Sequence, residues 1–263
     1  MPNTPGAAGR WWMPLPLLAL LLAALWTLDW NLPWFLALNA AAAGLPERFW
    51  SLATVLGDAV VVVALILPWL KRDPETARAL AIALLIALVL VPTLKDFYGH
   101  ARPAGVLAPE LYHAIGPRHV AGSFPSGHTT TAGIFFSVLL LRGGGAGRLW
   151  LRLGLVAALV LTGASRIAVG IHWPVDVVAG WLLAWALAWI GVRIAATTRF
   201  LAWSWSLWGL ALFCVAAAAA LVGGFDGHYP LANPFLRLLG AALLLQALWD
   251  WRAEGMTFWS RRR

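Results

Sequence analysis

Eight long apolar runs, separated by short polar stretches, make up most of this 263-residue sequence. A helix that crosses the hydrocarbon core of a bilayer needs about 20 mostly apolar residues, since lipid offers its backbone no hydrogen-bond partners. The runs therefore predict an all-α, polytopic bundle of transmembrane helices. We expect helices at 12–28, 50–70, 78–94, 128–141, 149–165, 175–195, 201–222 and 235–251.

The composition agrees with a membrane protein and excludes an ordinary soluble domain. Hydrophobic residues make up 61% of the chain and charged residues 11%, against about 45–50% and about 25% in soluble domains. The 18 tryptophans favour the bilayer interface, and many of them flank the apolar runs. A cleaved signal peptide is an alternative for the first run, because Arg10 precedes it and small residues follow at 39–44. The run ends in Trp26, Asp29 and Trp30, which favours a retained helix.

The distribution of cations predicts the orientation in the membrane. One set of alternate connections holds 13 of the 19 Lys and Arg residues and the other set holds six. The positive-inside rule then places both termini in the cytoplasm. The net charge of +8 is spread between the runs rather than gathered in a patch, so we expect no nucleic-acid partner. The single cysteine, Cys214, excludes an internal disulfide.

Three segments on the predicted outer side carry most of the unusual polar residues. The first is KDFYGHARP (95–103), where Lys95 and Arg102 bring two cations to the end of a helix that Pro103 stops. Cations that snorkel at a helix end are the alternative interpretation of this segment.

The second segment is SFPSGH (123–128). A helix capped by Ser126 would turn the Ser126 hydroxyl and the Gly127 amide toward an anion above its positive end. His128 follows within the first turn. An ordinary helix cap with an interfacial histidine is the alternative.

The third segment is SRIAVGIHWPVDVVAG (165–180). Pro174 suits the first position of a helix, which makes Trp173 the cap and Asp176 the third helical residue. A carboxylate there reaches back toward His172, where it would fix the tautomer and leave the second ring nitrogen as a nucleophile or base. The alternative is that Asp176 only caps its own helix.

Together these segments match Lys-x6-Arg-Pro, Pro-Ser-Gly-His and Ser-Arg-x5-His-x3-Asp, with intervals of 21 and 36 residues. The chain here resembles the membrane-bound type-2 phosphatidic acid phosphatases, also called lipid phosphate phosphatases, which share a site plan with vanadium haloperoxidases. The resemblance implies a six-helix core, a lipid phosphate substrate and no cofactor. We expect the core at 1–199, and one or two added helices with a basic cytoplasmic tail at 200–263.

The resemblance also implies a role for each motif residue. Lys95, Arg102 and Arg166 would bind the phosphate together with Ser126 and the Gly127 amide. His172 would attack phosphorus, Asp176 would orient it, and His128 would protonate the leaving oxygen through a phosphohistidine mechanism.

The substrate and the exact reaction stay open at this level. Undecaprenyl diphosphate, phosphatidylglycerol phosphate, phosphatidic acid and lipid A are all candidates, and the predicted site is the periplasmic face of a bacterial inner membrane. Two histidines and an aspartate also suit a metal, but three converging cations would repel it, so we expect metal independence. A lipid phosphotransferase is the nearest alternative function. A transporter or a non-catalytic membrane protein fits less well, and no obligate protein partner is predicted.

Overall fold

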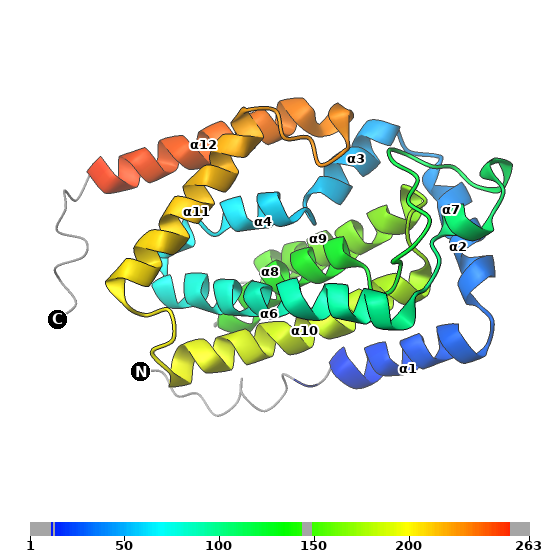
Figure 1. Ribbon diagram of the computed structural model, residues 1–263, viewed down its shortest axis with the longest axis horizontal. Helices are drawn as coiled ribbons and strands as arrows, with labels where there is room; N and C mark the ends of the chain where they lie inside the picture. The colour runs from blue at the N-terminus through cyan, green and yellow to red at the C-terminus, as the bar shows by residue number, and fades with distance from the viewer. Residues whose placement is uncertain (1–11, 13, 144–148, 253–263) are drawn as a thin grey trace.

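The computed structural model describes residues 12, 14–143 and 149–252, and within these residues the secondary structure is helical, with no strand. Four helices form the centre of the bundle: α6 (Pro74–Tyr98), α8 (Gly127–Arg142), α9 (Leu149–Ala168) and α10 (Pro174–Thr197). They run side by side in alternating directions (Figure 1). This arrangement confirms the predicted all-α, polytopic bundle.

Small residues allow α10 to pack closely against its neighbours α6 and α8. A Cβ on Gly133 of α8 would lie 2.5 Å from the Cβ of Ala184, and one on Gly191 of α10 would lie 2.5 Å from the Ala79 carbonyl oxygen. Close approach at small residues is a typical way for membrane helices to associate, because lipid provides no hydrophobic force between them.

The N-terminal part of the chain forms an elbow on the side of α10. Helix α1 (Pro14–Thr27) corresponds to the predicted first helix, whereas α2 (Asn31–Ala42) was not predicted. The two meet at an angle of 105°. Asp29 lies between them with φ at +53°, a left-handed conformation that Asp tolerates better than most residues.

The second predicted helix, at 50–70, is wrong as a single continuous element. The chain instead forms α3 (Glu47–Val55), α4 (Ala59–Leu65) and α5 (Trp69–Arg72), with a bend of 61° between α3 and the segment that follows. Asp58 caps α4 by accepting a hydrogen bond from the Val60 amide over 2.8 Å. Gly57 packs on α8, where an added Cβ would lie 2.6 Å from the His128 carbonyl oxygen.

The last two helices form a hairpin that covers α4 (Figure 1). These are α11 (Ser204–Val222) and α12 (Asn233–Arg252), joined by a loop that ends in the short helix η3 (Pro230–Ala232). Two further short helices, α7 (Pro103–Val106) and η1 (Pro109–Leu111), lie in the connection between α6 and α8. The predicted basic tail falls beyond residue 252, outside the described residues.

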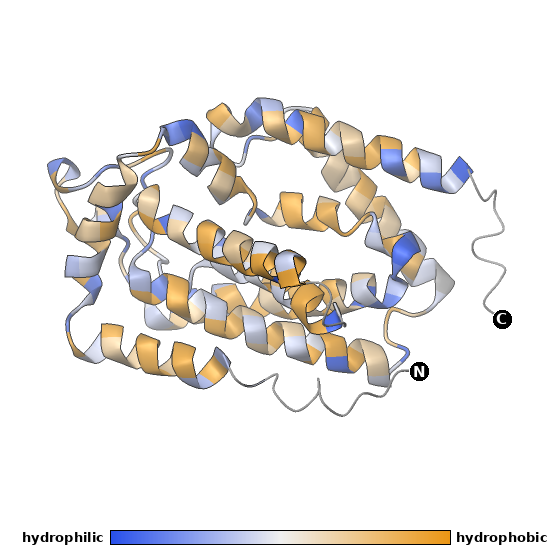
Figure 2. Ribbon diagram, turned by 180° about the vertical axis from the view of Figure 1, so that it is seen from behind, coloured by the Kyte–Doolittle hydropathy of each residue, from blue (hydrophilic) through white to orange (hydrophobic). Residues whose placement is uncertain are grey.

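Among the residues that the structure describes, five helical segments are long and apolar enough to cross a membrane, and the number rises to seven if each bent pair forms one span. Apolar residues run along the helices (Figure 2), and large ones point outward, such as Leu88 on α6, Leu212 on α11 and Leu238 on α12. In water such exposure is costly, whereas a bilayer accepts it. The structure therefore agrees with an integral membrane protein.

Candidate active site

The three sequence motifs meet at one end of the bundle. They lie at the C-terminal end of α6, the N-terminal end of α8 and the turn between α9 and α10, all toward the right of Figure 1. A cavity of about 190 Å³ opens between them. It is lined by Lys95, Arg102, Pro117, His119, Gly127, His128, Arg166, Ile171, His172, Gly227, His228 and Tyr229.

His172 and Asp176 form a buried pair at the start of α10. Asp176 Oδ2 accepts a hydrogen bond from the Trp173 amide over 2.8 Å and lies 3.3 Å from His172 Nδ1. The carboxylate therefore does both things that the sequence left open: it caps its helix and it contacts the imidazole. The other ring nitrogen, His172 Nε2, lies 3.5 Å from Arg102 Nη1 and so faces the cations.

His172 is buried, with 1% of its surface exposed. Burial lowers the pKa of the His172 imidazole below its ordinary value, and this effect outweighs the opposing effect of the Asp176 carboxylate. The ring is therefore neutral at physiological pH. With its Nδ1 proton directed at Asp176, it carries a lone pair on Nε2.

Two further side chains contact Asp176, and the sequence assigned a role to neither. Ser123 Oγ donates a hydrogen bond to Asp176 Oδ2 over 2.5 Å, and His100 Nδ1 lies 3.4 Å from Asp176 Oδ1. Both residues belong to the motif segments, and this position was a weak indication that they lie near the site. Neither contact could be inferred from spacing, because 53 and 76 residues separate the partners.

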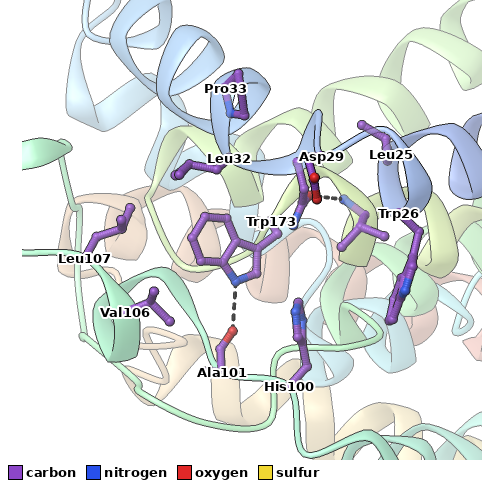
Figure 3. A pocket seen from close by; sticks show the side chains of 12 residues that line it. Leu25, Trp26, Asp29, Leu32, Pro33, His100, Ala101, Val106, Leu107 and Trp173 are labelled. Atoms are coloured by element: carbon purple, nitrogen blue, oxygen red, sulfur yellow. Dashed lines mark hydrogen bonds between the residues drawn. The ribbon is translucent and has the colours of Figure 1, made fainter.

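His100 also lines a second cavity, of about 760 Å³, together with Trp26 and Trp173 (Figure 3). The indole of Trp173 donates a hydrogen bond to the Ala101 carbonyl over 2.8 Å, and this contact forms part of the wall of that cavity. The His100 ring stacks on Trp26 of α1, with 6.0 Å between the ring centroids. His100 therefore connects the α1 elbow with the buried carboxylate.

Backbone carbonyls hold two of the three predicted cations. Lys95 Nζ donates a short hydrogen bond to the Gly122 carbonyl. The Arg102 guanidinium donates to the Ala121 and Gly122 carbonyls over 2.9 and 3.2 Å. These bonds bring no negative charge to either cation, since carbonyls carry no net charge, and the carboxylate that acts on both electrostatically is that of Asp176.

Arg166 is the most buried of the three cations, with 2% of its surface exposed. Its Nη1 donates to Thr54 Oγ1 on α3 and lies 3.5 Å from the Tyr229 hydroxyl. Arg166 Nε is buried and has no hydrogen-bond partner among the described residues. A buried donor without a partner is costly, so an anion in the cavity would be a suitable acceptor.

The N-terminus of α8 faces the cavity through Gly127 and His128. Ser126 caps this helix, as the sequence predicted, and accepts hydrogen bonds from the Thr129 amide and hydroxyl. Ser126 is fully buried and does not line the cavity. The helix dipole of α8 therefore reaches the cavity through the Gly127 amide region.

Three residues at the cavity mouth were not predicted as part of the site. Tyr229 and His228 come from the α11–α12 connection, and His119 comes from the α6–α8 connection. Partial burial and, secondarily, the nearby Arg102 lower the pKa of His119. Arg118, in the same α6–α8 connection, lies over the Tyr112 ring, 5.8 Å from its centroid.

Residues 76–200 match the PAP2 superfamily, and this segment contains every motif residue from Lys95 to Asp176. The chain carries a PAP2 superfamily domain. This finding confirms the resemblance drawn from the three motifs. The PAP2 domain ends before α11, so the connection that supplies His228 and Tyr229 lies outside it, as do Thr54 and Asp58.

Individual relatives of the PAP2 domain carry phosphatase names. The chain is 35% identical to the undecaprenyl-diphosphatase of Sulfolobus acidocaldarius over 138 residues, which are 52% of this chain and 64% of that protein. It is 33% identical to the lipid A 1-phosphatase of Rhizobium etli over 129 residues, 40% of this chain and 50% of the relative. The chain thus covers less than two thirds of the length of either protein.

A solved structure shows the same fold. The crystal structure of Aquifex aeolicus LpxE superimposes with a TM-score of 0.56 at 29% sequence identity. The match covers 94% of that chain and 62% of this one.

Proposed function

We propose that this protein is an integral-membrane phosphatase that hydrolyses a lipid phosphate or diphosphate without a metal ion. One observation carries the proposal: the free nitrogen of a buried, neutral His172 faces a cavity surrounded by Lys95, Arg102 and Arg166. A nucleophile among three cations suits a phosphate ester, whose negative oxygens would otherwise repel an attacking lone pair. The phosphatase names of the relatives support the same reaction.

The cavity offers a phosphate the donors that it needs. The two arginines supply planar guanidinium groups that bind phosphate oxygens in pairs, and Arg166 Nε has a free hydrogen for one of them. The start of α8 adds the positive end of a helix dipole at Gly127. Ser126 remains a predicted donor, which would require its buried hydroxyl to turn toward the ligand.

The proposed reaction has two steps. In the first, His172 Nε2 forms a bond to phosphorus, the bond between phosphorus and the lipid oxygen breaks, and His128 gives its proton to that oxygen. In the second, water attacks the phosphohistidine, His128 takes a proton from the water, and the phosphorus–nitrogen bond breaks. Phosphate is released, and both histidines return to their initial states.

A groove beside the cavity of about 190 Å³, which we call the phosphate cavity, supports a lipid substrate. It has a volume of about 520 Å³ and lies between α4, α6 and α11, with Val63, Leu88 and Phe213 among its walls. Gly127 lines both this groove and the phosphate cavity. A phosphate at Gly127 would therefore have an apolar path for its hydrocarbon chain. Undecaprenyl diphosphate, phosphatidylglycerol phosphate, phosphatidic acid and lipid A all carry such chains.

We further propose that residues 1–199 form the catalytic core in a bacterial inner membrane, with residues 200–263 as an addition and both termini in the cytoplasm. The site would then face the periplasm. Single cysteines at Arg72, at the end of α5 just before α6, and at Leu111, in the connection that follows α6, test this in a Cys214→Ser background. An impermeant maleimide applied to intact cells should label Leu111→Cys and not Arg72→Cys. The reverse pattern would contradict the orientation.

The function itself is tested by phosphate release from purified protein in detergent, with a chelator present. A panel of lipid monophosphates and diphosphates would rank the substrates. We expect release that disappears in His172→Ala, because alanine removes the Nε2 atom that we propose as the nucleophile. Loss of lipid phosphate without free phosphate would instead indicate transfer to another lipid. No turnover of any lipid by folded protein would overturn the proposal.

A further inference from the structure

Asp58 is an acidic residue at the break between α3 and α4, beside the PSGH histidine. Its Oδ2 atom lies 3.9 Å from His128 Nε2. Acidic side chains at membrane depth are costly and are usually functional. Asp58 lies outside the PAP2 domain, whose match begins at residue 76.

The His128 ring needs a partner at that nitrogen. His128 Nε2 is buried and has no hydrogen-bond partner among the described residues. Within the described part of the chain, Asp58 is the carboxylate recorded within 4 Å of this imidazole. A movement of about 1 Å would bring the two atoms to hydrogen-bond distance.

The charges around the cavity indicate what the contact between Asp58 and His128 does. Lys95, Arg102, Arg166 and the neutral His172 line the same cavity as His128. Three fixed cations oppose the imidazolium form that a proton donor must have. A nearby carboxylate opposes their effect.

The surrounding structure holds Asp58 in place. Its Oδ1 accepts the Val60 amide hydrogen at the start of α4. Gly57 packs directly on the backbone of His128, so the break in the helix and the start of α8 fit together. On the other side Gly227, in the α11–α12 connection, packs so closely that an added Cβ would lie 3.2 Å from Asp58 Oδ2.

We propose that Asp58 is a positioning residue that acts through His128. It accepts a hydrogen bond from Nε2 and stabilises the imidazolium, so that the proton on the remaining nitrogen, Nδ1, is ready for the departing lipid oxygen. The site then contains two His–Asp pairs, one for the nucleophile and one for the proton donor. This inference rests on the proposed phosphatase function.

The dependence on the leaving group tests this role. An alkoxide leaving group needs a proton as it departs, whereas 4-nitrophenolate leaves without one. Asp58→Asn removes the charge but keeps the helix cap, because Asn and Asp cap equally well. We expect kcat/KM for dodecyl phosphate to fall roughly 10- to 100-fold, and kcat/KM for 4-nitrophenyl phosphate to fall less than about threefold, since only the first reaction uses the general acid.

Two controls separate this role from a structural one. Asp29→Asn removes a carboxylate from the α1–α2 elbow, away from the phosphate cavity, and should leave both rates unchanged. In a His128→Ala background, Asp58→Asn should have no further effect, because the two residues act as one unit. An equal loss for both substrates, or a full additional loss in His128→Ala, would overturn the inference. Wild-type protein that hydrolyses neither these two substrates nor any lipid of the panel would overturn the phosphatase function itself.

Discussion

Ser123 and Asp176 form the shortest contact to the proposed catalytic carboxylate, with 2.5 Å between Ser123 Oγ and Asp176 Oδ2. Both side chains are fully buried. Hydrogen bonds to buried charged groups are stronger than those between neutral groups, and a lost partner cannot be replaced by bulk water. Ser123 therefore helps to keep Asp176 ionised and directed at His172.

Ser123→Ala should lower kcat by roughly 10-fold with little change in KM. A hydrogen bond to a charged group contributes about 1.5–3 kcal/mol, and we expect only part of this contribution to be specific to the transition state. Steady-state kinetics on the best lipid of the panel measures this. Ser137→Ala is the matched control, because Ser137 Oγ is also buried but has no hydrogen-bond partner among the described residues. A normal kcat in Ser123→Ala would show that this contact has no catalytic role.

His100 should matter less than Ser123, since its contact with Asp176 is longer, at 3.4 Å, and the ring is partly exposed. We expect His100→Ala to lower kcat by about threefold to tenfold, the scale of a net hydrogen-bond contribution of roughly 1 kcal/mol. His100→Asn keeps a donor near the position of Nδ1 and should recover most of the activity. If the asparagine variant is as slow as the alanine variant, the contact with Trp26 rather than with Asp176 explains the effect.

The pH dependence of kcat/KM should be bell-shaped. His172 must be neutral to attack, and burial lowers its pKa, so activity should fall on the acid side only well below pH about 6.5, the ordinary pKa of histidine. His128 must be protonated to donate, so activity should also fall as pH rises past its pKa. The profile is measured from about pH 2.5 to 10, so that the range includes the lowered pKa of His172, and is corrected for ionisation of the substrate.

The His128→Ala variant should have a lower kcat/KM than the wild-type protein, and its kcat/KM should no longer decrease on the alkaline side. A profile that is flat through the histidine range in the wild-type protein would contradict this division of roles. An acid decrease centred near pH 6.5 would contradict the assignment of His172 as a buried neutral nucleophile.

Filling the apolar groove should discriminate between lipid chains. Gly209 of α11 lines the groove, and no atom lies within 4 Å of a Cβ added there. Gly209→Leu should therefore fold normally and raise KM for long-chain phosphates by about tenfold, while short-chain phosphates are unaffected. A leucine side chain displaces a buried chain segment worth about 1.5 kcal/mol or more.

Gly154→Leu is the matched control for this variant. Gly154 lies on the exposed face of α9, also with no atom within 4 Å of an added Cβ, and does not line the groove. Turnover is compared for phosphates that differ only in chain length. Equal effects of Gly209→Leu on short and long chains would show that the hydrocarbon chain lies elsewhere.

Local signals were enough to predict much of this protein. The length of the apolar runs predicts the helices, because a bilayer requires about 20 apolar residues per span whatever the tertiary packing. Capping chemistry acts over three or four residues, so the starts of α8 at Ser126 and of α10 at Trp173 were predicted correctly. The His172–Asp176 contact lies within this range for the same reason.

Packing decided what local signals could not. The run at 50–70 gave no sign of the break at Gly57. At this break Gly57 packs against the backbone of α8, which is distant in sequence. The α2 helix was missed because its start depends on the left-handed Asp29 at the elbow.

The sequence by itself determined that this chain is a membrane bundle that carries the three-part motif set, because spans, caps and fixed charges are local properties. Only the tertiary structure decided which side chains support that set. Ser123, His100, Tyr229 and Asp58 reach the site across 53 or more residues of chain from the groups that they contact. Side-chain contacts of that kind depend on how helices cross, and no short-range pattern in a sequence encodes the crossing.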